Sequence, residues 1–136
     1  MDVFFYGLFM DKNILIKNGA NPSQPRMGYL NNYTLKIGNR ASLIPANNEK
    51  AYGIIMTLKD EEVVKLYAEE SVADYVPEQV EVVTTTNERI MATCYNLPLE
   101  LLTGTNESYA RSLHELTKQL NFPEDYLNKI SQYFSV

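Results

Sequence analysis

Two adjacent glutamates, Glu69 and Glu70, are the residues of this sequence with the clearest potential for acid or base chemistry. They follow a segment that begins with Asp60-Glu61-Glu62 and that we predict to be helical. Carboxylates at the start of a helix are stabilised by free backbone N–H groups and by the helix dipole, so those three have an ordinary structural explanation. Carboxylates at the end of a helix are disfavoured. The pair at positions 69 and 70 therefore requires another explanation.

Helical spacing distinguishes the two carboxylates. One face of the predicted helix carries the residues at positions i, i+3, i+4 and i+7, which are Val63, Leu66, Tyr67 and Glu70. If the helical register persists, Glu70 points toward the core with this apolar face, and Glu69 points toward solvent. Desolvation would then raise the pKa of Glu70, which suits a general base that works near neutral pH. The alternative is that the helix ends by Ala68 and that both glutamates are solvated.

The second candidate is a glycine turn near the N-terminus, within the sequence Val-Phe-Phe-Tyr-Gly-Leu-Phe-Met-Asp at residues 3–11. Residues 3–6 are apolar and aromatic and predict a buried strand, while Asp11 predicts the cap of a short helix through Asn18. A strand-to-helix turn at Gly7 exposes backbone N–H groups that can bind an anion or an oxyanion. Many such turns bind nothing, so the sequence leaves a structural turn and a binding turn open.

Other routes to catalysis lack the necessary residues. The only histidine, His114, lies off the apolar seam of its predicted helix, and we interpret it as a solvated surface residue. The only cysteine, Cys94, lies in a predicted strand without a basic neighbour, and we interpret it as a core residue. No serine elbow and no glycine-rich phosphate loop is present. This inventory argues against a metal site and leaves a carboxylate as the acid or base.

The composition limits the class of protein and its partners. A chain of 136 residues, 45% of them hydrophobic, predicts one domain over residues 1–136. The net charge of -5, without a cluster of Lys and Arg, argues against nucleic acid and anionic membranes as partners. Because no signal sequence and no long apolar span is apparent, we expect a cytoplasmic protein. The oligomeric state stays open.

The order of predicted elements indicates an α+β domain with a mostly antiparallel, curved sheet. Strands are expected at residues 3–6, 29–37, 41–44 and 51–57, and a hairpin at residues 75–84 and 89–96. Thr57 and Asp60 fit a capping box at the start of the helix that precedes Glu69. Two further helices are expected near the C-terminus, one with the seam Tyr109, Leu113, Leu116 and Leu120, and one that begins at Pro123.

Three motifs in this order resemble those of the γ-glutamylcyclotransferase-like family, which includes the AIG2-like proteins. Residues 5–10 (Phe-Tyr-Gly-Leu-Phe-Met) stand where the family has a Tyr-Gly-Ser-Asn or Tyr-Gly-Thr-Leu turn. Residues 40–45 and 51–55 are similar to its Ala-x-Leu-x-Pro and Tyr/Val-Gly-apolar segments. Residues 66–71, then Tyr75 and the strand at 80–82, are similar to its Leu-Asp-x-x-Glu-Gly segment and the strand that follows. The resemblance extends from Val3 to about Tyr95.

The resemblance implies a small, mixed, mostly antiparallel β-barrel with flanking helices. It also implies a reaction in which the α-amine of a γ-glutamyl group attacks its own γ-carbonyl, releasing 5-oxoproline and an amine or amino acid. The catalytic glutamate of the family matches Glu70, which would act as general acid and base without a metal or organic cofactor. The residues implied to bind substrate are Tyr6, Gly7, Leu8, Phe9 and Met10, with Tyr75 and Tyr95 as hydroxyl groups that face either the pocket or the core. Arg40 is either a partner of the substrate carboxylate or a surface residue.

Several positions depart from the family pattern. Leu8 and Phe9 replace the polar residues of the turn, Ser71 replaces a glycine, and Tyr67 replaces an acidic residue. Pro77 stands where many relatives have an arginine. These departures leave the fold unaffected and bear on substrate and activity. The alternative function is therefore a non-catalytic module of the same fold that binds a small ligand or a protein.

Overall fold

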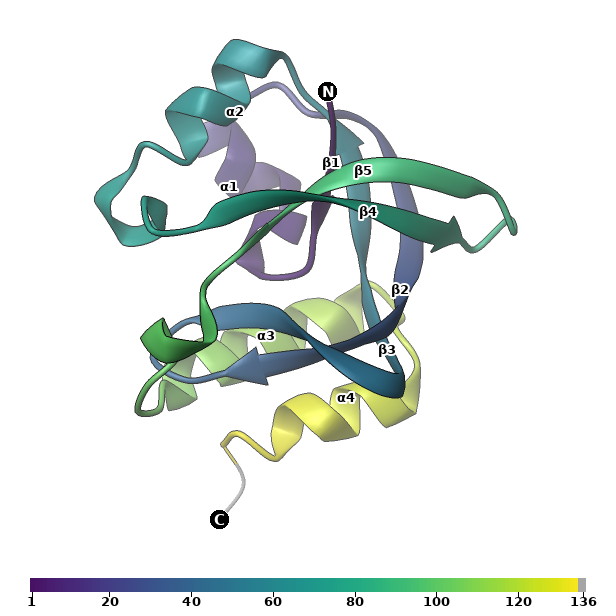
Figure 1. The fold of residues 1–136 in the computed structure, drawn as a ribbon, viewed down its shortest axis with the longest axis vertical. Coiled ribbons are helices and arrows are strands. Elements are labelled where there is room, and N and C mark those ends of the chain that lie inside the picture. The colour runs from purple at the N-terminus through teal and green to yellow at the C-terminus, as the bar shows by residue number, and fades with distance from the viewer. Residues whose placement is uncertain (135–136) are drawn as a thin grey trace.

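The computed structural model describes residues 1–134, and its five strands close into one barrel (Figure 1). Around the barrel the strands follow the order β1-β3-β2-β4-β5. The strands are β1 (Asp2–Phe5), β2 (Ser23–Ile37), β3 (Ala41–Thr57), β4 (Val76–Thr84) and β5 (Arg89–Asn96). All neighbouring pairs are antiparallel except β1 and β5, which are parallel and close the barrel through Val3 and Thr93. The predicted mixed, mostly antiparallel barrel is confirmed.

Strand β1 is the centre of the core. Val3, Phe4 and Phe5 are almost fully buried, because β1 lies between β3 and β5 and has protein on both faces. An unbroken apolar run is typical of such a strand. The strand therefore delivers Gly7 and the residues after it to one end of the barrel.

Strands β2 and β3 are longer than the sequence predicts. Residues 41–44 and 51–57 belong to one strand, and β2 begins at Ser23, whereas the sequence predicted this strand only from residue 29. The register shifts between Asn31 and Tyr33, and Asn32 and Asn48 both adopt a positive φ of 65°. These irregularities bend β2 and β3 without ending their pairing. Pro45 therefore lies within one continuous strand, β3.

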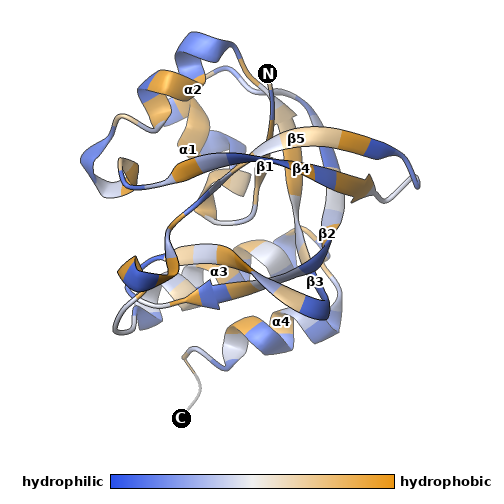
Figure 2. Ribbon diagram, viewed as in Figure 1, coloured by the Kyte–Doolittle hydropathy of each residue, from blue (hydrophilic) through white to orange (hydrophobic). Residues whose placement is uncertain are grey.

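Helices cover the barrel on two sides (Figure 1). They are α1 (Lys12–Lys17), α2 (Asp60–Leu66), α3 (Glu107–Gln119) and α4 (Glu124–Ser131), with short 3-10 helices η1 (Leu8–Met10), η2 (Glu70–Val72) and η3 (Leu99–Leu101). Hydrophilic and hydrophobic residues alternate along α3 and α4 (Figure 2), which bury residues such as Leu113 and Ile130 as predicted. No helix within residues 1–134 is long and apolar enough to cross a membrane.

Two local predictions need correction, and a third is confirmed. Helix α2 is capped at Lys59, whose backbone N–H donates to Glu62 at 2.9 Å, whereas Thr57 ends β3 and bonds Asp2 instead. His114 is half-buried, with its ring edge-on to Phe134 at 5.3 Å between centroids, so it is not a fully solvated residue. Cys94 is buried as expected, and burial raises the pKa of its thiol.

Candidate active site

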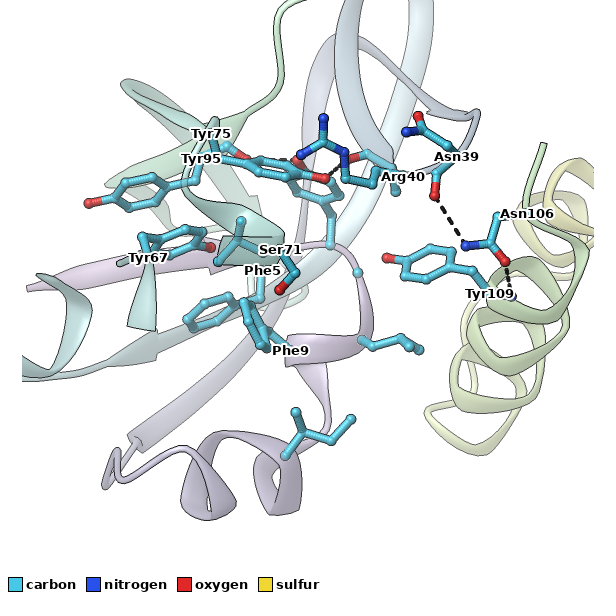
Figure 3. A pocket seen from close by; sticks show the side chains of 16 residues that line it. Phe5, Phe9, Asn39, Arg40, Tyr67, Ser71, Tyr75, Tyr95, Asn106 and Tyr109 are labelled. Carbon is cyan, nitrogen blue, oxygen red and sulfur yellow. Dashed lines mark hydrogen bonds between the residues drawn. The ribbon is translucent and has the colours of Figure 1, made fainter. Parts of the chain in front are cut away.

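A cavity of about 480 Å³ opens at the end of the barrel where β1 leads into η1 (Figure 3). Six segments surround it: the end of β1 with the Gly7 turn, α1, the start of β3, the chain between α2 and β4, the end of β5, and the start of α3. Its lining consists of Phe5, Tyr6, Gly7, Leu8, Phe9, Ile14, Asn39, Arg40, Ala41, Tyr67, Ser71, Val72, Tyr75, Tyr95, Asn106 and Tyr109. Six of the seven residues that the resemblance implied for substrate binding therefore lie at one cavity. Met10 is the exception.

Met10 belongs to the core. Its side chain is 2% exposed, and its backbone N–H donates to the Gly7 carbonyl at 3.0 Å. The N–H of Asp11 is likewise taken by the Leu8 carbonyl at 3.0 Å. The turn thus closes into the 3-10 helix η1, which ends at Met10, and the Met10 N–H is not available to a ligand. Gly7, Leu8 and Phe9 form the part of the turn that faces the cavity.

Tyr109, at the start of α3, lies directly against Gly7. A Cβ atom added to Gly7 would collide with the Tyr109 hydroxyl. Burial raises the pKa of Tyr109, and a hydrogen bond with the Leu8 backbone lowers it in part. The Asn106 side chain fixes this arrangement, because it accepts from the Tyr109 N–H at 3.1 Å and donates to the Asn39 carbonyl at 3.1 Å.

Tyr6 is a structural link as well as a lining residue. Its hydroxyl donates to the Tyr95 backbone carbonyl at 2.7 Å, which joins the end of β1 to the end of β5. Burial is the main reason that its pKa lies well above the ordinary value. Tyr75 makes a comparable bond to the Ala41 carbonyl. The hydroxyl groups of Tyr6 and Tyr75 are therefore already engaged with the protein backbone.

Among the described residues that line the cavity, Arg40 is the one with a charge. Its guanidinium lies 3.4 Å from the carboxylate of Asp74 and 6.0 Å from the ring centroid of Tyr75. The Arg40 side chain is 26% exposed, whereas Asp74 is 59% exposed and lies outside the lining. An ion pair that is this open to water is weak, so a ligand carboxylate can compete with Asp74 for the guanidinium.

The structure does not bring Glu70 into the cavity. Helix α2 ends at Leu66, and Glu69 has an extended backbone (φ -60°, ψ 139°), so the helical register does not continue to position 70. The prediction that a continuous helix points Glu70 toward the core is therefore wrong. Glu70 is exposed at the start of η2 and does not line the cavity, although Tyr67 before it and Ser71 after it do. Within residues 1–134, no aspartate or glutamate lines the cavity.

Sequence reasoning missed several lining residues. Asn39, Asn106 and Tyr109 are the main ones, because helical spacing placed Tyr109 on a core seam and no motif marked the two asparagines as site residues. Asn106 does carry a local signal, since it caps α3. No group of three or more His, Cys, Asp or Glu within residues 1–134 could hold a metal ion.

Comparison with known proteins identifies the family. Residues 3–115 match the family model described as gamma-glutamyl cyclotransferase, AIG2-like. A search of curated protein sequences found no significant match. Because the family model spans most of the chain, the chain's membership follows from this match.

Solved structures have the same fold at low sequence identity. A gamma-glutamyl cyclotransferase is 17% identical, with a TM-score of 0.77 over 98% of this chain and 87% of that one. An uncharacterized protein from Homo sapiens is 19% identical, with a TM-score of 0.75 over 97% of this chain and 86% of that one. A yeast gamma-glutamyl cyclotransferase specific to glutathione is 12% identical, with a TM-score of 0.73 over 98% of this chain and 95% of that one. This chain, a closed five-stranded barrel with its cavity at the Gly7 turn, belongs to the gamma-glutamyl cyclotransferase, AIG2-like family.

Proposed function

We propose that the protein is a γ-glutamylcyclotransferase-type enzyme that binds a γ-glutamyl compound in the cavity beside Gly7. The observation that carries the proposal is the position of Arg40, a single guanidinium next to a backbone turn in an otherwise uncharged cavity. An Arg fork matches the geometry of a carboxylate. The α-carboxylate of a γ-glutamyl group would therefore replace Asp74 as the partner of Arg40.

In the proposed reaction, the α-amine nitrogen forms a bond to the γ-carbonyl carbon, and the bond from that carbon to the leaving amine nitrogen breaks. The products are 5-oxoproline and a free amine. The cavity would hold the substrate folded, so that nitrogen and carbonyl carbon are close, which removes most of the entropic barrier to ring closure. Backbone N–H groups of Gly7 and Phe9 would stabilise the negative charge that develops on the carbonyl oxygen.

The reaction also requires a proton to leave the α-ammonium group and reach the leaving amine. We assign this transfer to Glu70, in agreement with the family motif. Glu70 is adjacent to the lining residue Ser71, so a local shift of the segment between α2 and β4 would bring its carboxylate to the cavity. Substrate binding supplies a reason for that shift, because it would release Asp74 of the same segment from Arg40.

A buried free thiol at Cys94 suits the reducing cytoplasm expected from the sequence.

The test is direct. Purified protein is incubated with a panel of γ-glutamyl amino acids, peptides and amines, and 5-oxoproline is measured by mass spectrometry. We expect 5-oxoproline from at least one compound, at a rate proportional to protein concentration. The absence of product from every compound would contradict the proposed activity.

A second function is favoured by one observation, the exposed position of Glu70 outside the cavity. A protein that keeps the cavity and lacks a base within it would bind a γ-glutamyl compound or 5-oxoproline without turnover. A thermal shift with these ligands, together with no 5-oxoproline production, would identify the binding module.

A further inference from the structure

The cavity has two unlike ends (Figure 3). Polar and charged groups gather at one end, formed by Asn39, Arg40, Asn106 and Tyr109. Rings gather at the other end, which we call the aromatic wall and which consists of Phe5, Phe9, Tyr67 and Tyr95. A ligand that spans the cavity therefore meets hydrogen-bonding groups on one side and apolar surface on the other.

The aromatic wall is a continuous series of ring contacts. Phe5 and Phe9 lie edge-to-face with centroids 6.0 Å apart, and Phe9 and Tyr67 repeat this geometry at 6.0 Å. Tyr67 then stacks on Tyr95 at 3.8 Å with an interplanar angle of 12°. Since the rings use much of their surface on one another, they form a wall that suits an apolar or aromatic group better than a cage for a cation. Ile14 extends the apolar lining.

Charge in the cavity restricts the ligand further. Arg40 is the only charged residue of the lining, and one carboxylate of the ligand satisfies it. The α-ammonium group of the γ-glutamyl head gives its proton to Glu70 in the proposed reaction. A second carboxylate, in the leaving group, would have no cationic partner in the described lining, and a second ammonium group would have no anionic one. Removing an unpaired charge from water is costly. The cavity therefore favours a ligand with one carboxylate at the polar end and no charge at the aromatic wall.

We infer that the group released from the γ-glutamyl substrate is an uncharged apolar or aromatic amine that lacks a carboxylate and a second amine. The inference rests on the proposed function, since it names the substrate class of that site. The γ-glutamyl head lies toward Arg40, and the leaving amine lies against Phe9 and Tyr67. Phe9 determines this specificity, because it belongs both to the Gly7 turn that would hold the reacting carbonyl and to the aromatic wall.

Two matched pairs of probes test the inference on the full chain. γ-L-Glutamyl-2-phenylethylamide and γ-L-glutamyl-L-phenylalanine differ by one carboxylate. γ-L-Glutamyl-hexylamide and γ-L-glutamyl-5-aminopentylamide differ by the exchange of a terminal methyl for an ammonium group. Isothermal titration calorimetry gives Kd for all four, and kcat/KM is measured wherever 5-oxoproline forms. We expect the uncharged member of each pair to bind about tenfold more tightly, in line with the cost of an unpaired charge.

Variants of Phe9 test the role of the aromatic wall. Phe9→Ala is expected to weaken binding of the 2-phenylethylamide about fivefold more than binding of γ-L-glutamyl-methylamide, because a methyl group has far less surface to lay against the wall. Phe9→Leu keeps the volume and apolar character, and it is expected to retain hexylamide binding while losing part of the preference for the ring. Thermal melting of each variant checks that the fold is intact.

The outcomes separate this inference from the proposed function. A preference for the charged probes, equal affinity within each pair, or no binding of any probe would overturn the inference. If the charged probes release 5-oxoproline as efficiently as the uncharged ones, the inference is overturned and the proposed activity still stands. The expected order of Kd values without any 5-oxoproline would support the inference about the ligand and contradict the enzymatic proposal.

Discussion

The hydroxyl of Tyr109 lies against Gly7, so that a side chain of even one carbon at position 7 would collide with it. The two residues come from opposite ends of the chain, one from the end of β1 and the other from the first turn of α3. Their contact brings the start of α3 to the cavity and places a hydroxyl beside the turn that would hold a substrate oxygen. Gly7 is therefore required for two reasons: a larger residue would collide with Tyr109, and a side chain would stand between a substrate and the backbone of the turn.

Gly7→Ala is predicted to lower the free energy of unfolding by about 1–3 kcal/mol, the usual cost of overpacking a site that cannot expand. Urea denaturation measures the loss. Tyr109→Phe removes the atom with which the new methyl group collides, so the double variant should recover at least half of the lost stability. Tyr109→Phe alone is the control. If the double variant is no more stable than Gly7→Ala, the collision is not the cause.

Asp2 should make stability depend on pH at the start of β1. Burial raises the pKa of Asp2, but hydrogen bonds from Thr57 and Arg26 and the charge of Arg26 outweigh it, so the pKa lies below its ordinary value of 3.8. Because the folded-state pKa is depressed, this stabilisation is present above the unfolded-state pKa and is lost as pH falls through the folded-state value. Asp2→Asn should therefore be destabilised at pH 7, with the difference from wild type shrinking below about pH 4.

Urea midpoints of wild type and Asp2→Asn between pH 2 and pH 7 check this prediction. Glu115→Gln, at an exposed position of α3, is the matched control and should show no comparable change. A difference between wild type and Asp2→Asn that stays constant over the whole pH range would show that the carboxylate charge does not stabilise β1.

The sequence correctly predicted those elements of the site that depend only on neighbouring residues. The apolar run of β1, the cap at Asp11 and the hairpin of β4 and β5 all follow from residue types and spacing. The contact of Tyr109 with Gly7 could not be predicted in this way, because it depends on how α3 packs against the barrel. Tyr109 has the helical spacing of a core residue, and only the tertiary structure shows that its hydroxyl reaches the cavity.

The failure of the helical register at Glu70 has a similar cause. Spacing correctly placed Val63 and Leu66 in the core, each 1% exposed. No glycine or proline marks the end of α2 after Leu66. The helix ends at Leu66, and the ring of the next residue, Tyr67, stacks on Tyr95 of a strand far along the chain. Because the end of α2 depends on a tertiary contact, the sequence carries no local signal for it. The predicted helical spacing was therefore continued to Glu70, one turn too far.

Arg40→Ala is predicted to weaken the binding of γ-glutamyl ligands about tenfold to a hundredfold, which corresponds to the loss of a charge-assisted hydrogen bond. Isothermal titration calorimetry measures the change. The thermal midpoint should change little, because the partner of Arg40 in the free protein is an exposed carboxylate. Asp74→Asn removes only the competing carboxylate and should bind the same ligands as tightly as wild type or more tightly. Unchanged affinity in Arg40→Ala would exclude the guanidinium as the carboxylate partner.

Glu70→Gln is predicted to lower kcat about 10²-fold to 10⁴-fold, the usual contribution of a general acid or base, and to change KM little. The side chain is exposed in the free protein, so the thermal midpoint should stay close to that of wild type. Glu69→Gln is the matched control, because it removes a neighbouring exposed carboxylate and should keep nearly full activity. Single-turnover release of 5-oxoproline isolates the chemical step for both variants. Wild-type rates in Glu70→Gln would remove Glu70 from the mechanism, and a selective loss in Glu69→Gln would move the base to position 69.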